Sequence, residues 1–149
     1  MLALSLAPIL LGLSLSASIG NHVSYVGGTR PDLSQGCSGV MDASDESYLV
    51  FFSKDSNFRV PYDKVNLLEY GQNVSRRYVL ALAINPMFFM AKKRRHFLTI
   101  GYQDETGKQQ AVLFQVEKTD IRTVLVTLEA RTGLRVEYQD EEARKSPKG

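Results

Sequence analysis

The stretch HFLTIGYQDETGKQQAVLFQV, from His96 to Val116, indicates the kind of fold that this chain adopts. Its two halves, 96–103 and 109–116, are rich in β-branched and aromatic residues, as strands are. DETGK lies between them, and its Gly107 suits the left-handed backbone of a short turn. The stretch therefore predicts an antiparallel hairpin.

The residues that follow this hairpin change their period from two to about 3.6. Apolar side chains recur with the i, i+3, i+4, i+7 spacing of one helical face, at Ile121, Val124, Leu125 and Leu128. Thr119 or Asp120 is placed to cap the helix, and Gly133 is placed to end it. We expect an amphipathic helix that covers part of the core.

The sequence before this hairpin predicts more short strands. A strand over 22–26 precedes a loop over 29–39, which holds Pro, Asp, Ser and spaced glycines. YLVFFS (48–53) and FRVPY (58–62) flank the turn residues KDSN and indicate a second hairpin, with Pro61 at a strand end or edge. Further short strands are expected at 40–43, 65–72 and 134–138, with Gly71 as a bulge or bend.

Together these elements predict a mainly β chain with one C-terminal α-helix. About seven antiparallel strands in a small bent sheet leave exposed edges and an open end, and a terminal helix can cover that end. We therefore expect an antiparallel β-barrel capped by the helix, with the layout of a pleckstrin-homology-like (PH-like) domain.

Four runs of the sequence resemble a family of uncharacterised bacterial exported proteins with a PH-like core. These runs are YVGGT (25–29), FRVPYDKVNLLEYGQ (58–72), KKRRHFLTIGYQDETGKQQAVLF (92–114) and RTVLVTLEARTG (122–133). The resemblance implies a PH-like domain over 21–138 and an N-terminal signal peptide, and it implies no activity. The loop over 29–39 carries one Arg balanced by one Asp, so phosphoinositide binding there is not supported.

The N-terminal region has no charge. None of the 18 basic and 16 acidic residues precedes Arg30, and residues 1–20 form a Leu-rich run that ends in small residues. This layout predicts a signal peptide that is cleaved after Ser18 or Gly20, although no basic residue precedes the apolar run. The alternatives are an uncleaved membrane anchor, because 19 helical residues almost span a hydrocarbon core of about 30 Å, and a buried core helix.

Composition excludes two broad classes of protein. A hydrophobic fraction of 44% excludes wholesale disorder, and a net charge of +2 lacks the basic excess of a dedicated nucleic-acid binder. Cys37 is the single cysteine, so an intramolecular disulfide is impossible. Residues 139–149 are expected to form a charged, flexible tail. The oligomeric state is not determined by the sequence.

We find no pattern in the sequence that predicts catalysis, a metal site or a cofactor. The two histidines, His22 and His96, form no metal-ligand spacing, and the paired acidic residues fall in expected turns or in the tail. We expect His96 to be the first residue of a strand. An uncharacterised hydrolase remains the enzyme-class alternative, and it requires a cleft that gathers His96 with an acidic residue.

The segment YVLALAINPMFFMAKKRR (78–95) is the strongest candidate for a binding site. Apolar residues divided by Pro86 run directly into four cations, and two further arginines precede the segment. Such a segment suits an irregular apolar groove of a protein or peptide partner, or the interface of a membrane with anionic headgroups. The candidate binding residues are Arg76, Arg77, Met87, Phe88, Phe89, Lys92, Lys93, Arg94 and Arg95.

A purely structural interpretation of the same segment stays open. In it Leu80, Leu82 and Ile84 lie on a core strand, Phe88 and Phe89 pack beneath the barrel, and 92–95 is a solvated turn. The sequence therefore predicts an exported, non-enzymatic binding or scaffold module at the cell envelope. A protein or peptide is the preferred partner, and an anionic membrane surface that contacts 86–95 is the alternative.

Overall fold

The computed structural model describes residues 20–74, 76–85, 87 and 95–148. The predicted signal peptide lies almost entirely outside this range, as do candidate residues Phe88, Phe89, Lys92, Lys93 and Arg94. No helix in the described part of the chain is long and apolar enough to cross a bilayer.

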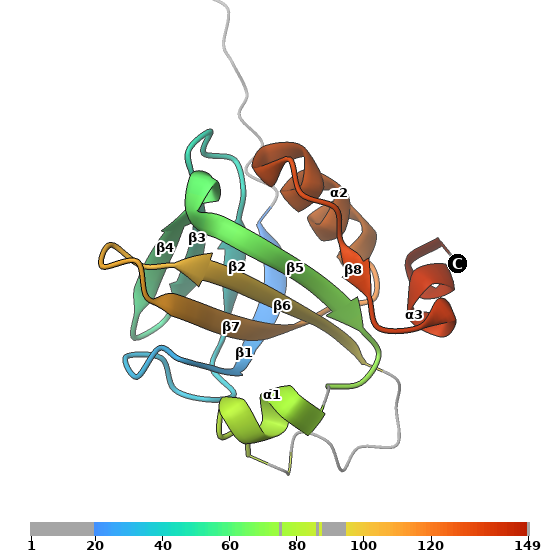
Figure 1. Ribbon diagram of the computed structural model, residues 1–149, viewed down its shortest axis with the longest axis horizontal. Helices are drawn as coiled ribbons and strands as arrows, with labels where there is room; N and C mark the ends of the chain where they lie inside the picture. The colour runs from blue at the N-terminus through green and yellow to red at the C-terminus, as the bar shows by residue number, and fades with distance from the viewer. Residues whose placement is uncertain (1–19, 75, 86, 88–94, 149) are drawn as a thin grey trace, which may run out of the picture.

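The described chain is mainly β (Figure 1). Its eight strands form one sheet in the hydrogen-bonded order β4-β3-β2-β1-β7-β6-β5-β8. The strands are β1 (Asn21–Gly28), β2 (Ser38–Asp42), β3 (Tyr48–Ser53), β4 (Asn57–Pro61), β5 (Val65–Gly71), β6 (His96–Gln103), β7 (Gln109–Val116) and β8 (Glu137–Tyr138). The helices are η1 (Tyr62–Lys64), α1 (Arg76–Ala81), α2 (Ile121–Thr132), α3 (Glu141–Lys145) and η3 (Ser146–Lys148).

Both predicted hairpins are confirmed. Strands β6 and β7 pair from His96 opposite Val116 to Gln103 opposite Gln109, and Gly107 has the positive φ (80°) that the turn requires. Strands β3 and β4 pair from Tyr48 opposite Pro61 to Phe52 opposite Asn57. His96 is the first residue of β6, as expected.

The prediction of a closed barrel is wrong. Strands β4 and β8 are the two ends of the sheet, and the topology of the described residues pairs neither with the other. Helix α2 is present where the periodicity placed it, but β8 and α3 follow it, so it is not a single terminal helix. Asp120 is at its N-cap position without a side-chain capping hydrogen bond, and Gly133 ends it with a φ of 73°.

The irregularity in β5 is also not where it was predicted. The register shifts between Val65 and Leu67, whereas Gly71 is the last residue of the strand. A Cβ at Gly71 would clash with the side chain of Gln139, which follows β8, so this glycine leaves room for that side chain. The segment 139–149, expected as a flexible tail, carries α3 and η3, and Ala143 of α3 is buried.

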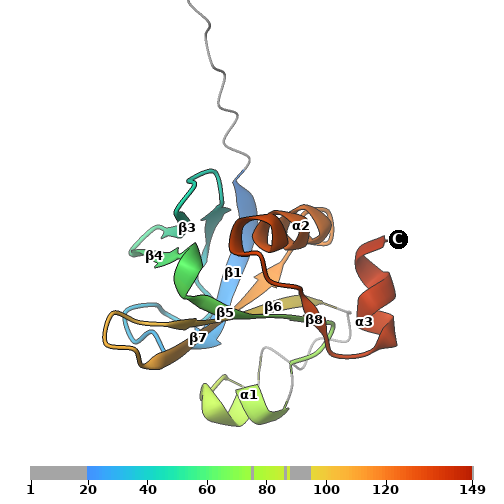
Figure 2. The same cartoon turned by 45° about the horizontal axis from the view of Figure 1, so that its top comes forward.

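The central strands are covered on both faces. Successive side chains of a strand point to opposite sides, and on these strands both sides are buried. Tyr25, Leu98 and Phe114 belong to the main core together with Ile121, Val124, Leu125 and Leu128 of α2. Their chain neighbours Val26, Phe97 and Leu113 belong to a second, smaller core together with Leu82 and Ile84. Helices α2 and α1 accordingly lie on opposite sides of the sheet (Figure 2).

Candidate functional site

The candidate segment does not contain the predicted strand. Residues Arg76–Ala81 form α1, and Leu82 and Ile84 follow it and pack on the face of the sheet opposite α2. Leu80 is 77% exposed, so it is not a core residue. The strand interpretation of Leu80, Leu82 and Ile84 is therefore wrong, because a run this apolar suits a strand or a packed helical turn equally well.

Two contacts hold the segment after α1 in place. Gln35, from the loop between β1 and β2, donates from Nε2 to the carbonyl of Ala83 (3.1 Å) and accepts from the N–H of Asn85 (3.0 Å). Ile84 packs so closely on β1 that a Cβ at Gly27 would come within 2.8 Å of its Cγ1. The sequence does not indicate the Gln35 contact, because about 50 residues separate the two partners.

Ala83 adopts a left-handed conformation with φ of 47°, which an L-residue adopts at a cost of about 1–2 kcal/mol. The packing of Leu82 and Ile84 on either side of it maintains this conformation. Such strained residues tend to occur at functional sites. The backbone after α1 is thus held in one specific shape.

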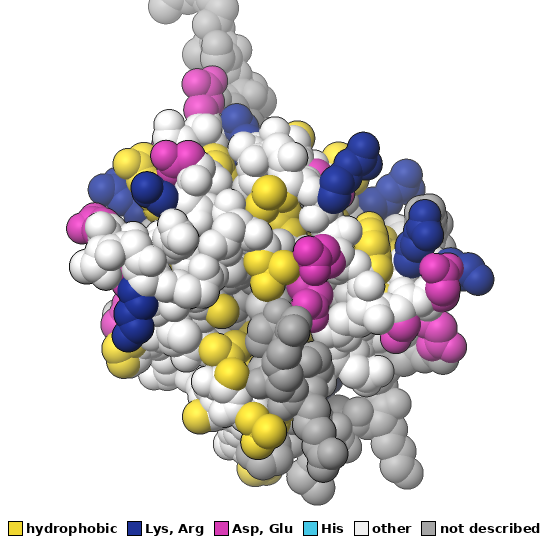
Figure 3. Space-filling model, in the orientation of Figure 1, with side chains coloured by type: hydrophobic (Ala, Val, Ile, Leu, Met, Phe, Trp, Pro, Cys, Tyr) yellow, Lys and Arg dark blue, Asp and Glu magenta, His cyan; other side chains and the backbone are white. Residues whose placement is uncertain are grey.

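This shape exposes large apolar side chains. Leu80 is 77% exposed and Met87 is 74% exposed. Hydrophobic side chains are visible over α1 at the lower end of the molecule in Figure 3. We call α1 together with residues 82–85 and 87 the α1 surface.

The predicted cations are only partly described. Arg76 and Arg77 are the first two residues of α1. Arg95 is half-buried at the start of β6, and its Nη1 donates to Gln115 Oε1 on β7 (3.1 Å). The structure thus attaches the two ends of the predicted binding segment, α1 and Arg95, to one side of the domain.

His96 occupies a buried position, 6% exposed. Its Nδ1 lies 2.6 Å from the hydroxyl of Tyr70, and the two rings stack with centroids 5.9 Å apart. Burial is the main cause that lowers the pKa of His96, and the nearby Lys118 cation lowers it further, while the Glu117 carboxylate opposes this shift. The tyrosine contact, which the sequence does not reveal, gives His96 a structural environment in the core.

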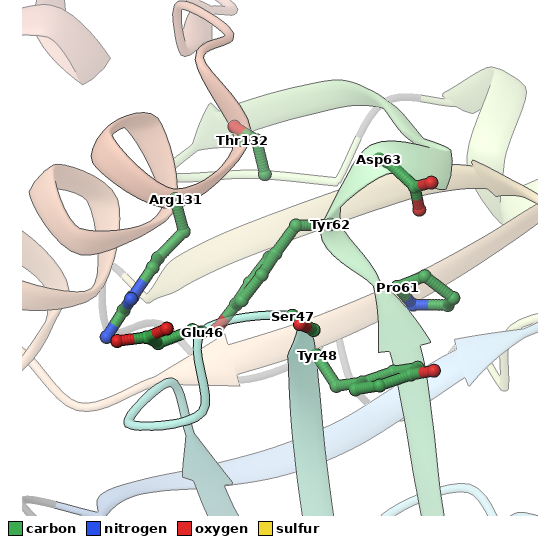
Figure 4. A pocket seen from close by; sticks show the side chains of 8 residues that line it. All are labelled: Glu46, Ser47, Tyr48, Pro61, Tyr62, Asp63, Arg131 and Thr132. Carbon is green, nitrogen blue, oxygen red and sulfur yellow. The ribbon is translucent and has the colours of Figure 1, made fainter.

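A cavity of about 510 Å³ lies between the C-terminal end of α2 and the ends of β3 and β4 (Figure 4). Arg131 enters it from α2, where its Nη2 donates to the carbonyl of Ser44 (3.2 Å). The hydroxyl of Tyr62 is buried without a hydrogen-bond partner, and burial raises its pKa to about 12. The lining residues are Glu46, Ser47, Tyr48, Pro61, Tyr62, Asp63, Arg131 and Thr132.

The loop between β1 and β2 has its one arginine already paired. Arg30 donates two hydrogen bonds to the Asp32 carboxylate, at 2.8 and 2.6 Å, and its guanidinium lies 5.2 Å from the centroid of the Phe58 ring. This pairing lowers the pKa of Asp32. The charge balance expected from the sequence is thus a direct contact.

Cys37, in the same loop, is a half-buried free thiol whose pKa is raised by burial.

Among the described residues, no group of three or more His, Cys, Asp or Glu side chains is arranged to hold a metal ion. No protein-family model matches the chain, and a search of curated proteins finds no match to it.

Proposed function

We propose that this protein is a non-enzymatic binding module and that its α1 surface binds a protein or peptide partner. The exposure of Leu80 and Met87, on a segment fixed in one shape, carries this proposal. A segment whose backbone is already held in one shape loses less conformational entropy when a partner covers it. The unbranched side chain of methionine also adapts to irregular apolar surfaces.

The charge of the segment indicates the chemistry of the partner. Residues 76–95 contain six basic side chains and no acidic one, whereas the rest of the chain contains 12 basic and 16 acidic side chains. A partner that combines apolar side chains with carboxylates would complement this surface, and long-range attraction would increase its association rate.

An anionic membrane surface is the second candidate partner. The same combination of exposed apolar side chains and neighbouring cations favours it, since each basic residue near such a surface contributes about 1 kcal/mol. In the described part of the α1 surface, the large apolar side chains that are exposed are Leu80 and Met87, and their area is small in comparison with the long apolar face of a membrane-bound helix. We therefore prefer a protein or peptide.

We further propose that the fold is PH-like, in an open form. Two antiparallel meanders, β1 to β4 and β5 to β7, are joined by pairing between β1 and β7, and a helix follows β7, which supports this assignment. A fold of this kind has no function of its own, so the function rests on the surface and not on the fold.

The place of action that we propose is the cell envelope, after export directed by residues 1–20. Mass spectrometry of the mature protein tests this point: we expect an N-terminus directly after Ser18 or Gly20. An intact Met1 in exported protein would contradict cleavage.

Site-specific photo-crosslinking tests the binding surface. A photoreactive residue at Met87 should capture a specific protein in the envelope, whereas one at Val126, which is 59% exposed on α2, should not. The Leu80→Asp variant should reduce the Met87 crosslink at least several-fold, and reconstitution with the purified partner should reproduce this loss. Equal crosslinking from positions 87 and 126 would refute the proposed surface.

Vesicle co-sedimentation separates the two candidate partners. Neutral and anionic vesicles are compared, with the variant in which Lys92, Lys93, Arg94 and Arg95 are all alanine as the control. We expect little sedimentation with either vesicle. Strong sedimentation with anionic vesicles alone that the alanine variant loses would favour the membrane.

A further inference from the structure

The C-terminal residues of the chain lie along the outer edge of β5. Glu137 and Tyr138 of β8 pair in parallel with Glu69 and Tyr70, while the other edge of β5 pairs with β6. Both views show β8 beside β5 with α3 beyond it (Figures 1 and 2). We call residues 134–148 the strap. Two paired residues cover only part of a seven-residue strand, so the strap is a short addition to a sheet edge.

The edge of β5 has a place for one particular side chain of the strap. Gln139 donates from its backbone N–H to the carbonyl of Tyr70 (3.1 Å) and from Nε2 to Glu69 Oε1 (3.0 Å). Its Oε1 fills the space where a Cβ of Gly71 would be. Gly71 does not have a positive φ, so its backbone does not require glycine, and the strap explains the missing side chain.

Two other strap residues, Val136 and Tyr138, contact the domain beside Gln139. The ring of Tyr138 meets that of Tyr70 edge-on, with centroids 5.8 Å apart. Val136 is buried in the main core, and its N–H donates to Glu129 Oε1 of α2 (2.8 Å). The edge between β5 and α2 therefore holds an extended segment through an apolar, an aromatic and an amide side chain, at Val136, Tyr138 and Gln139.

The strap has few anchors in comparison with the domain. Among its described side chains, Val136 and Ala143 alone are buried. The ion pair between Arg144 and Glu141 is exposed and lies within α3, and Gln72 donates one hydrogen bond to Ser146 Oγ (2.6 Å). A segment with so few buried apolar contacts opens locally at a lower free energy than global unfolding. Gly133, with its left-handed backbone, is the point where the strap leaves α2.

We propose that this edge of β5 is a second binding site, for an extended peptide of a partner protein, and that the strap occupies it as a built-in competitor. The partner peptide has the pattern of the strap, apolar-x-aromatic-amide, and it binds when the strap opens. Strand addition of this type combines backbone hydrogen bonds with side-chain pockets. The site is separate from the α1 surface and does not depend on it.

A labelled peptide with the sequence of residues 134–148 tests this proposal on the full chain. We expect weak binding to the wild-type protein, because the open fraction limits its apparent affinity. The Ala143→Glu variant places a charge at a buried strap position and leaves the β5 edge unchanged. It should bind the peptide about tenfold more tightly or better.

Three controls define the site. Adding Gly71→Val to the Ala143→Glu variant should abolish the gain, because a side chain then fills the place of Gln139. A peptide with alanine in place of Tyr138 should bind several-fold more weakly. Leu80→Asp in the Ala143→Glu background should leave peptide binding unchanged, which separates a failure of this site from a failure of the α1 surface.

Hydrogen exchange shows whether the strap opens. Strap amides should exchange faster in the Ala143→Glu variant, with the amides of β6 and β7 unchanged. If that variant loses its fold, the double variant Tyr138→Ala, Gln139→Ala opens the strap through exposed side chains. The proposal would be overturned if the strap amides exchanged only when the core amides do, at the rate of global unfolding. It would also be overturned if the strap opened and the peptide did not bind more tightly. Strap-exchanged dimers in place of peptide binding would also overturn it, since the occupant would be a second copy.

Discussion

Helices α2 and α1 cover opposite faces of the same sheet, but they do so in different ways. Helix α2 spans 12 residues and buries four apolar side chains in the main core, alongside residues from every one of β1 to β7. Helix α1 spans six residues and leaves Leu80 exposed. It is followed by Leu82 and Ile84, which lie in a second core where five of the described residues are buried. Helix α2 therefore contributes mainly to the core, whereas the segment of α1 orders an exposed apolar surface, which is the surface that we propose for binding.

The largest expected effect is on the α2 side. Leu125→Ala or Leu128→Ala should lower the free energy of unfolding by about 2–5 kcal/mol, because each removes a buried side chain from the main core. Urea denaturation measures the change. Val126→Ala, on the exposed side of the same helix, should stay within about 0.5 kcal/mol. Equal effects at Leu125 and Val126 would show that α2 is not packed as described.

A smaller effect is expected on the α1 side. Ile84→Ala should cost about 2 kcal/mol, the low end of the range for such a change, because the smaller core can settle around the lost volume. Leu80→Ala is the matched control and should leave the denaturation midpoint nearly unchanged, since its side chain is exposed. A larger loss from Ile84 than from Leu125 would reverse the comparison between the two faces.

Removal of the Gln35 contact should have a still smaller effect on stability. Gln35→Ala deletes two hydrogen bonds to the backbone of 83–85, which corresponds to about 1 kcal/mol. Amide exchange should accelerate in residues 79–85 and stay unchanged in α2. Gln35→Glu keeps the acceptor for the Asn85 N–H and should restore part of the protection. Uniform acceleration throughout the chain would contradict a local role.

The pH dependence should arise on the α2 side, at His96. Its pKa is lowered in the folded protein, so the unfolded chain takes up this proton at higher pH than the folded one. The contribution of His96 to the free energy of unfolding is therefore fully present above the ordinary histidine pKa. It is lost as the pH falls from there through the lower pKa of the folded protein. Urea denaturation between pH 8 and 5 should show this loss in the wild type and a flatter profile in His96→Gln. Identical profiles would assign the dependence to other groups.

Local patterns determined much of the fold. Strands β6 and β7 lie where the β-branched and aromatic residues around a turn placed them. Helix α2 lies where the helical spacing placed it, because its one buried face imposes its period on the sequence. The same reasoning failed for 78–84. There Leu80, Leu82 and Ile84 alternate as in a strand, yet only Leu82 and Ile84 are buried, after a short helix.

The candidate site was predicted as a segment but not as a surface. The sequence shows that Met87 precedes a run of four cations at 92–95. The structure adds that Leu80 and Met87 are both exposed and that Gln35 holds the backbone at Ala83 and Asn85. The contact from Gln35 and the left-handed Ala83 depend on packing between distant parts of the chain. No local pattern encodes them.

The sequence by itself thus determined the β-rich class, the two hairpins and the amphipathic helix, because hydrophobic period and turn residues act over a few neighbours. Only the tertiary structure decided that the sheet stays open, that α1 covers its second face, and that residues 137–138 join the edge of β5 in parallel. These features depend on which distant surfaces meet, and a short stretch of sequence carries no record of its remote partner.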